Sequence, residues 1–327
     1  MTNNLSLLAG NTLELHYHFD DDTHTIDAFV QNRCECEFLS ILREIAGFLN
    51  TDTSIETEPF AEGGIRRWFK VVSREDNEKS AVSAALITSM LTTVIATPLS
   101  TSMGTAATKI AERVFDDKEL KKLKKGNLKI EIEKIMQELK NKCKDLDQNN
   151  VIKKRRSNFY EILNKYPKVK KVSFVVANSE KTPLLDEKVV YRKEFKNQIL
   201  VSDNLDPITN DNAIIEIISP VLKKSRYKRW LGIYKGNPVS FQMKSQEFNA
   251  LVQKGDVQFK NGTSINCQLN IRRKIDNEGN ERVIGYDVLR VNSYLENEIA
   301  VETFEGKNQM KKNEVKAQQL DLFEMFF

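Results

Sequence analysis

The segment from Ser80 to Thr108 contains no charged residue, although Asp, Glu, Lys and Arg make up 29% of the chain. It reads SAVSAALITSMLTTVIATPLSTSMGTAAT, and Ser and Thr fill 12 of its positions. As a single helix it would be roughly 43 Å long at ~1.5 Å per residue, whereas the hydrocarbon core of a bilayer is ~30 Å thick. The segment is therefore long enough to span a membrane, but it is richer in hydroxyl groups than a membrane anchor.

In a helix, the hydroxyl side chains of this segment form a polar stripe. Because hydroxyls can bond to backbone carbonyls or water, such a stripe costs less in a membrane than charges would. We therefore expect a transmembrane or pore-forming segment over residues 73–110, in which Pro98 kinks the helix as a gate. The alternatives are a helical hairpin that is broken at Pro98 and buried in an oligomer core, and a disordered segment. The expected pore-lining residues are Ser89, Thr92, Thr93, Thr97, Ser100 and Thr101.

The region before the uncharged segment predicts a hairpin and helices. Residues 13–19 alternate between apolar and polar side chains, which is typical of a half-buried strand, and residues 25–30 are expected to return as its partner. The period becomes helical over residues 27–49. Residues 65–70 contain Trp close to Arg and Lys in the sequence, which suits a membrane interface or a surface-packed helix. We assign residues 1–72 to this N-terminal hairpin plus amphipathic helix.

The second half of the chain predicts a β-rich domain. A charged linker helix is expected over residues 111–150, followed by a cytosolic α+β ligand-sensing domain over residues 151–296. A short helix begins after the N-cap candidate Ser245 and ends at Gly255. The expected strands cover residues 169–176, 214–218, 230–234, 239–243, 265–274 and 282–291. The fold class is therefore α+β with one Ser/Thr-rich helical segment.

Cations and aromatic residues alternate in the segment from Lys223 to Trp230, which suits phosphates and stacked bases. Nearby, one strand face is predicted to carry Asn266, Gln268 and Asn270 beside two further cations. The candidate ligand-binding residues are Lys223, Lys224, Arg226, Tyr227, Lys228, Arg229, Trp230, Arg272 and Lys274. Nucleotide or oligonucleotide binding is expected; contact with anionic lipid headgroups and a loop without a ligand are the alternatives.

The three histidines His16, His18 and His24 flank an acidic run, Asp20–Asp22. His-x-His with carboxylates is one way to hold a divalent metal, but the pattern fits a solvated hairpin face better. No P-loop, dinucleotide-binding, GxSxG or nucleotidyltransferase motif is present. We therefore expect a protein that is not an enzyme and needs no cofactor or metal, with a hydrolytic site over residues 20–24 as an alternative.

The four cysteines show no CxxC spacing, which indicates free thiols in a reducing compartment. The N-terminal residues show no signal peptide pattern. A net charge of +4 is too small to indicate nucleic-acid binding by the chain as a whole.

The C-terminal residues 297–327 are predicted to be a flexible tail that carries a short linear motif. The motif matches, at all five positions, the pentapeptide by which bacterial partners dock on the replicative sliding clamp. Its residues are Gln319, Leu320, Asp321, Leu322 and Phe323. The alternative is an amphipathic end that packs on its own domain or on a neighbouring subunit.

The order of these segments resembles the membrane effector of bacterial anti-phage defence systems of the Hailong type. The resemblance covers residues 13–291 and implies a homo-oligomeric ion channel, a tetramer being one option, in the bacterial inner membrane. It also implies a single-stranded oligodeoxynucleotide ligand, made by a nucleotidyltransferase encoded alongside, that binds through residues such as Lys224, Arg226 and Trp230. Binding or loss of this ligand would gate the channel. The alternative function is a soluble DNA-associated protein that docks on the sliding clamp.

Overall fold

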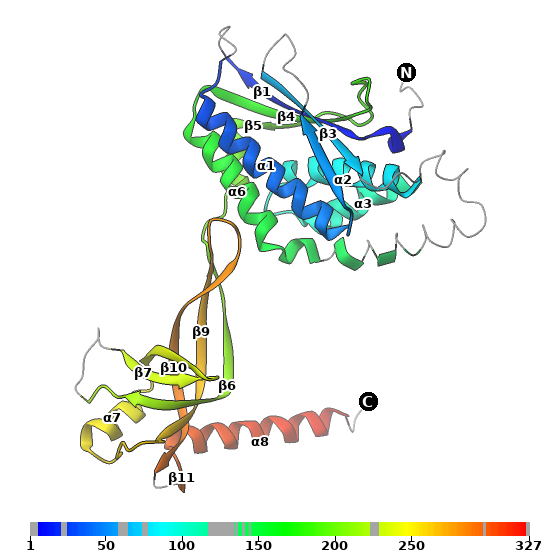
Figure 1. Ribbon diagram of the computed structural model, residues 1–327. Helices are drawn as coiled ribbons and strands as arrows, with labels where there is room; N and C mark the ends of the chain where they lie inside the picture. Colours follow the sequence, from blue (N-terminus) through cyan, green and yellow to red (C-terminus); the bar gives the residue numbers. More distant parts are fainter. Residues whose placement is uncertain are drawn as a thin grey trace. The chain divides into compact units, whose positions relative to one another are not determined.

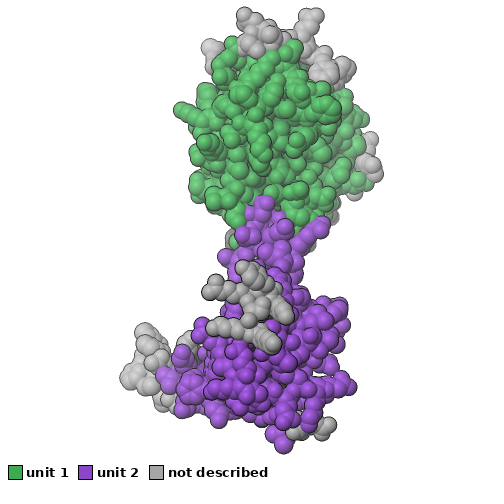
Figure 2. All heavy atoms as spheres, turned by 90° about the vertical axis from the view of Figure 1, so that its left-hand side faces the viewer, with its two compact units in different colours: residues 1–202, 276–280 green, residues 203–275, 281–327 purple. Residues whose placement is uncertain are grey.

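The computed structural model describes residues 6–20, 25–57, 65–73, 78–116, 134, 137–138, 141–143, 145–222, 229–296 and 299–324; for residues 73, 78–80 and 316–324 it describes the backbone alone. The chain forms two compact units. Unit 1 comprises residues 1–202 and 276–280, and unit 2 comprises residues 203–275 and 281–327 (Figure 2). The expected boundary at residue 150 differs from this division, because the next helix and two strands belong to unit 1. The α+β fold class is confirmed.

Unit 1 is a five-stranded antiparallel sheet with helices on one face (Figure 1). The strand order is β2-β3-β1-β4-β5. The strands are β1 (Thr12–Phe19), β2 (Thr53–Thr57), β3 (Ile65–Ser73), β4 (Val169–Ala177) and β5 (Lys188–Tyr191). The helices are α1 (Ala28–Phe48), α2 (Glu78–Ala96), α3 (Met103–Phe115) and α6 (Asn150–Lys165).

Strand β1 lies at the centre of this sheet and pairs with β3 and β4. The expected hairpin partner, residues 25–30, does not form a strand. Instead Asp27 caps α1, since its Oδ1 accepts hydrogen bonds from the backbone N–H groups of Phe29 and Val30 at 2.9 and 3.0 Å. Residues 65–70 are part of strand β3, so neither the membrane interface nor the surface helix predicted there is observed.

The uncharged segment forms a hairpin of helices α2 and α3 inside unit 1. Its apolar residues, among them Leu86, Met90 and Val94, are buried in the same core as β1 and α1. The hydroxyls of Thr92 and Thr97 bond to carbonyl oxygens of their own helix, at 3.1 and 2.7 Å. This arrangement corresponds to the alternative of a hairpin broken at Pro98. Among the described residues, no helix is long and apolar enough to cross a membrane.

Side chains from other elements bind the last carbonyl groups of α2. Arg156 Nη1 donates to the carbonyl oxygens of Val94 and Thr97 at 2.8 and 2.7 Å, and the Tyr160 hydroxyl donates to Ile95 at 2.9 Å. Gln198 donates to Ala96 at 3.4 Å. These carbonyls have no partner within a helix that ends here, so the contacts replace the bonds that Pro98 prevents.

Unit 2 is a six-stranded sheet in the order β11-β10-β8-β7-β6-β9, and β9 also pairs with β10. Its core contains Trp230, Phe241, Phe248 and Ile265. The elements are β6 (Asn204–Ser219), β7 (Trp230–Tyr234), β8 (Asn237–Met243), α7 (Gln246–Lys254), β9 (Ser264–Ile275), β10 (Glu281–Glu296), β11 (Ile299–Glu302) and α8 (Phe304–Glu324). The predicted N-cap is confirmed, since Ser245 Oγ accepts from Phe248 N at 3.1 Å, and Gly255 ends α7 with φ +85°.

The predicted tail is largely regular structure. Strand β11 pairs with β10, and α8 follows it. Most of the charged helix expected over residues 111–150 lies outside the described residues. All four cysteines are free thiols, as expected.

Candidate functional site

The polar face predicted around Asn266 is present on strand β9. Ile265, Cys267 and Leu269 point into the core of unit 2, and the alternate residues Asn266 and Gln268 are half-buried on the opposite face. Opposite Gln268 on strand β10 lies Arg290, and opposite Asn266 lies Ser293. The sheet therefore places a row of amide side chains beside a guanidinium group.

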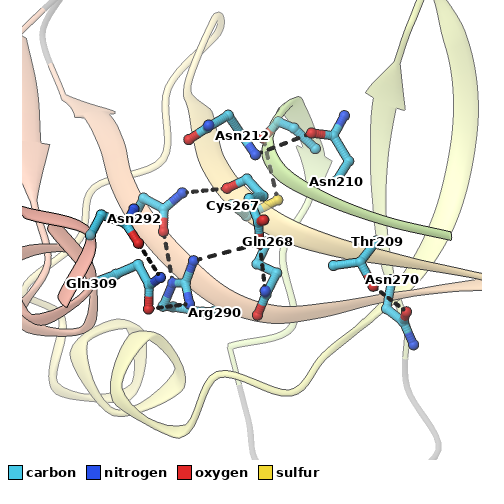
Figure 3. Close-up of polar contacts among 12 residues, drawn as sticks. Thr209, Asn210, Asn212, Cys267, Gln268, Asn270, Arg290, Asn292 and Gln309 are labelled. Carbon is cyan, nitrogen blue, oxygen red and sulfur yellow. Dashed lines mark hydrogen bonds and ion pairs between the residues drawn. The ribbon is translucent and has the colours of Figure 1, made fainter. Parts of the chain in front are cut away.

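Arg290 is at the centre of these polar contacts (Figure 3). Its Nε donates to Asn292 Oδ1 at 2.9 Å, and its Nη1 donates to Gln309 Oε1 of helix α8 at 3.1 Å. Its Nη2 lies 4.0 Å from Asp211 Oδ1. Only 17% of the Arg290 side chain is exposed. Its guanidinium is hydrogen-bonded to two neutral oxygens, and the Asp211 carboxylate lies at the distance limit of an ion pair.

Neighbouring amides extend the network across three strands. Asn292 Nδ2 lies 2.8 Å from both Asn266 Oδ1 and the backbone oxygen of Asp211. Gln268 Nε2 donates to Asp211 Oδ1 at 2.6 Å. We call Asp211, Asn266, Gln268, Arg290, Asn292 and Gln309 the amide cluster.

Helix α8 forms one wall of the site. Gly306 lies against strand β10, where a Cβ atom would come within 2.1 Å of the Asn292 carbonyl oxygen, so only glycine fits. The Glu247 carboxylate accepts the backbone N–H groups of Phe304 and Glu305, both at 2.7 Å, and so caps α8. These contacts fix the helix beside the amide cluster.

The amide cluster, apart from Gln268, lines a cavity of about 360 Å³ within unit 2. Asn212, Glu302 and Asn313 also line it, together with Met310. A cavity of this size lies at the lower end of the range for small-molecule sites. Its lining combines amide donors and acceptors with one cation, Arg290, and two carboxylates, Asp211 and Glu302.

Cations continue the polar face of β9 beyond the amides. Arg272 and Lys274 lie on this face, as predicted, with Gly285 and Arg282 opposite them on β10. Arg272 Nε lies 3.2 Å from the Asp287 carboxylate and Lys244 Nζ lies 2.8 Å from it. Asp287 is buried and is matched by two cations, so this group keeps a net positive charge.

The segment from Lys223 to Trp230, which was predicted to bind a ligand, is described only at its last two residues. Residues 223–228, and with them Lys223, Lys224, Arg226, Tyr227 and Lys228, lie outside the described residues. Arg229 is exposed. Trp230 is 2% exposed, and its ring lies 5.7 Å from that of Phe259 and 6.1 Å from that of Phe241. Because β7 alternates, Trp230 points into the core, and its predicted role in stacking on a base is wrong.

The predicted pore-lining residues fall inside unit 1 or on the turn after α2. Ser89 and Thr92 are buried within the core of the unit. Thr93 and Thr97 are half-buried at the end of α2, while Ser100 and Thr101 are exposed in the turn before α3. Of the predicted pore-lining residues, Ser89 and Thr92 therefore face the interior of unit 1.

His16 and His18 lie side by side on strand β1, with ring centroids 3.7 Å apart. Burial, followed by the charges of His18 and Arg66, lowers the pKa of His16 to about 4. Within the described parts of the chain, no group of three or more His, Cys, Asp or Glu side chains has metal-binding geometry. His24 and two of the predicted aspartates lie outside them.

The tail motif, Gln319–Phe323, belongs to the backbone of helix α8 rather than to a flexible tail. Side chains before it, from Met310 to Val315, are exposed. Docking on the sliding clamp stays a prediction.

Sequence reasoning missed Asp211, Arg290, Asn292 and Gln309. The strand containing Arg290 was predicted, but the pairing of β6, β9 and β10 and the position of α8 are long-range features. A local pattern does not encode them. The polar alternation of β9 was the available signal, and it led to three neighbouring amides.

Comparison of the chain with known protein families, with curated proteins and with solved structures gave no match. The function proposed below therefore depends on the geometry of the chain itself.

Proposed function

We propose that unit 2 binds a nucleotide or a short single-stranded nucleic acid along strand β9, as a sensor rather than an enzyme. The main support is the continuity of one strand face: the amide cluster and its cavity come first, and the cations Arg272 and Lys274 follow. This face combines groups suited to base edges with groups suited to phosphates.

The amide cluster suits a base. Asn and Gln side chains present a donor and an acceptor side by side, which matches the edges of nucleobases, and Arg forms paired bonds with guanine or with phosphate. In the free protein these groups are hydrogen-bonded to one another, so a bound ligand would replace some of those hydrogen bonds with its own. For Arg290, replacing the neutral oxygen of Gln309 by a phosphate oxygen gives a stronger, charge-assisted bond.

The cations suit the backbone of a longer ligand. From Asn266 to Lys274 the strand extends roughly 27 Å at ~3.4 Å per residue, which is long enough for several nucleotides. Lys274 is exposed at the far end of this face. A base in the cavity and phosphates toward Lys274 would therefore use the whole strand.

We propose ligand binding without channel gating, because Ser89 and Thr92 of α2 are buried in unit 1 and no helix among the described residues is long and apolar enough to cross a membrane.

Binding of fluorescein-labelled single-stranded 12-mers of mixed sequence tests the proposal. Lys274→Glu should weaken binding because it reverses a charge beside the phosphates, and Lys254→Glu, at an exposed position of helix α7, is the matched control. Arg290→Met should weaken binding about 5- to 100-fold, as expected for a contact worth ~1–3 kcal/mol. Circular dichroism shows whether each variant is folded. Equal affinities for the wild type, Lys274→Glu and Arg290→Met would contradict the proposal.

A further inference from the structure

The sheet of unit 1 has a polar face on the side opposite its helices. Leu13, Leu15 and Tyr17 of β1 point toward the helices, so the alternate residues His16 and His18 point the other way. The strand register sets out the neighbours of these histidines. Arg66 of β3 and Ser173 of β4 flank His16, and Lys171 of β4 lies between His18 and Tyr191 of β5. We call these six residues the open sheet face.

Another part of the same side is covered. The chain between β4 and β5 crosses it, with Lys181 Nζ 5.3 Å from the centre of the Trp68 ring. Trp68 is accordingly buried, at 6% exposure, whereas Tyr191 is 50% exposed. The Arg66 side chain is 45% exposed. The ring of Tyr191 and the cation of Arg66 are thus accessible on the open sheet face.

Three rings lie on this face. The imidazoles of His16 and His18 lie against each other, and His18 Nε2 is 2.9 Å from Ser173 Oγ, which orients its ring. Lys193 Nζ lies 5.9 Å from the centre of the Tyr191 ring, at the edge of the sheet. Aromatic rings on a sheet are used to stack unpaired bases, which offer a π-face whatever their sequence.

Cations and carboxylates lie together on this face, where Arg66 Nε is 3.4 Å from the Glu14 carboxylate. The positive charges of Arg66 and Lys171 both disfavour protonation of the histidines, while Glu187 opposes them. Burial and these cations together lower the pKa of both imidazoles, which favours the neutral form of the rings.

We propose that the open sheet face is a second binding site, on which the imidazole pair and Tyr191 stack bases of a single-stranded nucleic acid. Arg66 and Lys171 hold its phosphates. A single strand fits better than a duplex, because paired bases do not offer their faces to a sheet. The site shares no residue with the amide cluster of unit 2, so the two can be tested separately.

The test measures binding of labelled single-stranded and duplex 12-mers to the full chain that contains Arg290→Met, which suppresses the site in unit 2. Tyr191→Leu should weaken single-strand binding about 5- to 30-fold, since it removes one stacked base. Lys171→Gln should weaken it and also lower the slope of log affinity against log salt by about 0.7, as expected for one lost phosphate contact. The matched controls are Phe29→Leu on α1, an exposed aromatic residue, and Lys109→Gln on α3, an exposed lysine.

Loss of affinity in Tyr191→Leu and Lys171→Gln, with both controls unchanged and duplex bound more weakly, supports the proposal. Unchanged affinity in both variants overturns it, and so does equal binding of duplex and single strand. If only the unit 2 variants weaken binding in the wild-type background, the open sheet face is refuted and the function proposed for unit 2 stands. If only the variants of the open sheet face weaken binding, the function proposed for unit 2 is refuted and the open sheet face stands. Thermal unfolding shows that each variant is folded.

Discussion

At the scale of single residues, Arg156 determines how the uncharged segment is accommodated. Its guanidinium is fully buried and donates to two carbonyls at the end of α2. Burial lowers the pKa of Arg156 to about 10, which leaves it charged at neutral pH. A charge at the carbonyl end of a helix is favourable, and here it also replaces the bonds lost at Pro98.

Arg156→Met should therefore lower the free energy of unfolding by about 2–4 kcal/mol, because carbonyls are left buried without donors. The control is Lys165→Met on the same helix. Lys165 is 73% exposed and pairs with Glu161 at 2.6 Å, so its loss should cost less than about 1 kcal/mol. Urea unfolding of both variants measures the difference, and equal destabilisation would show that Arg156 has no special role.

His16 should make stability depend on pH. Its pKa is about 4 in the folded protein and near 6.5 in the unfolded chain, so the unfolded chain binds more protons between these values. The contribution is complete above pH 6.5 and is lost as the pH falls toward 4. We expect a lower unfolding temperature at pH 5.0 than at pH 7.5, and a smaller difference in His16→Gln. An identical difference in the variant would rule His16 out as the cause.

At the scale of elements, helix α8 depends on contacts at its first turn. Glu247 of α7 caps it, and Gly306 allows its close approach to β10. Glu247→Ala should speed hydrogen exchange of the amides of residues 304–310 about 5- to 10-fold, since a lost cap costs ~1 kcal/mol. Glu314→Ala, an exposed residue on the same helix, should leave exchange unchanged. The cap is unimportant if both variants exchange alike.

Local sequence patterns predicted correctly those elements whose structure depends on residues close together in the sequence. The alternation of β9, the cap at Ser245 and the stop at Gly255 depend on neighbours in sequence, and each was confirmed. The hairpin expected after β1 failed because Asp27 caps a helix there. The burial of α2 inside unit 1 was predicted only as an alternative, because low charge alone does not show whether lipid or protein surrounds a helix. Its partner Arg156 lies about sixty residues further along the chain.

At the scale of the whole molecule, the chain divides after residue 202. The predicted boundary at residue 150 followed a polar stretch, but Asn149 within that stretch caps α6 through its side chain and also bonds to Glu44 of α1 at 3.0 Å. The candidate site needed long-range information of the same kind: its members come from β6, β9, β10 and α8. Sequence reasoning therefore found the face of β9 and missed the residues opposite it.

Hydrogen exchange with mass spectrometry can show whether a single-stranded nucleic acid binds along β9. Exchange of the full chain is compared with and without a saturating, mixed-sequence single-stranded 12-mer. We expect slower exchange in peptides from residues 264–274, 286–293 and 303–310, and loss of this protection in Arg290→Met. Protection absent from all three regions while the oligonucleotide is bound would contradict it.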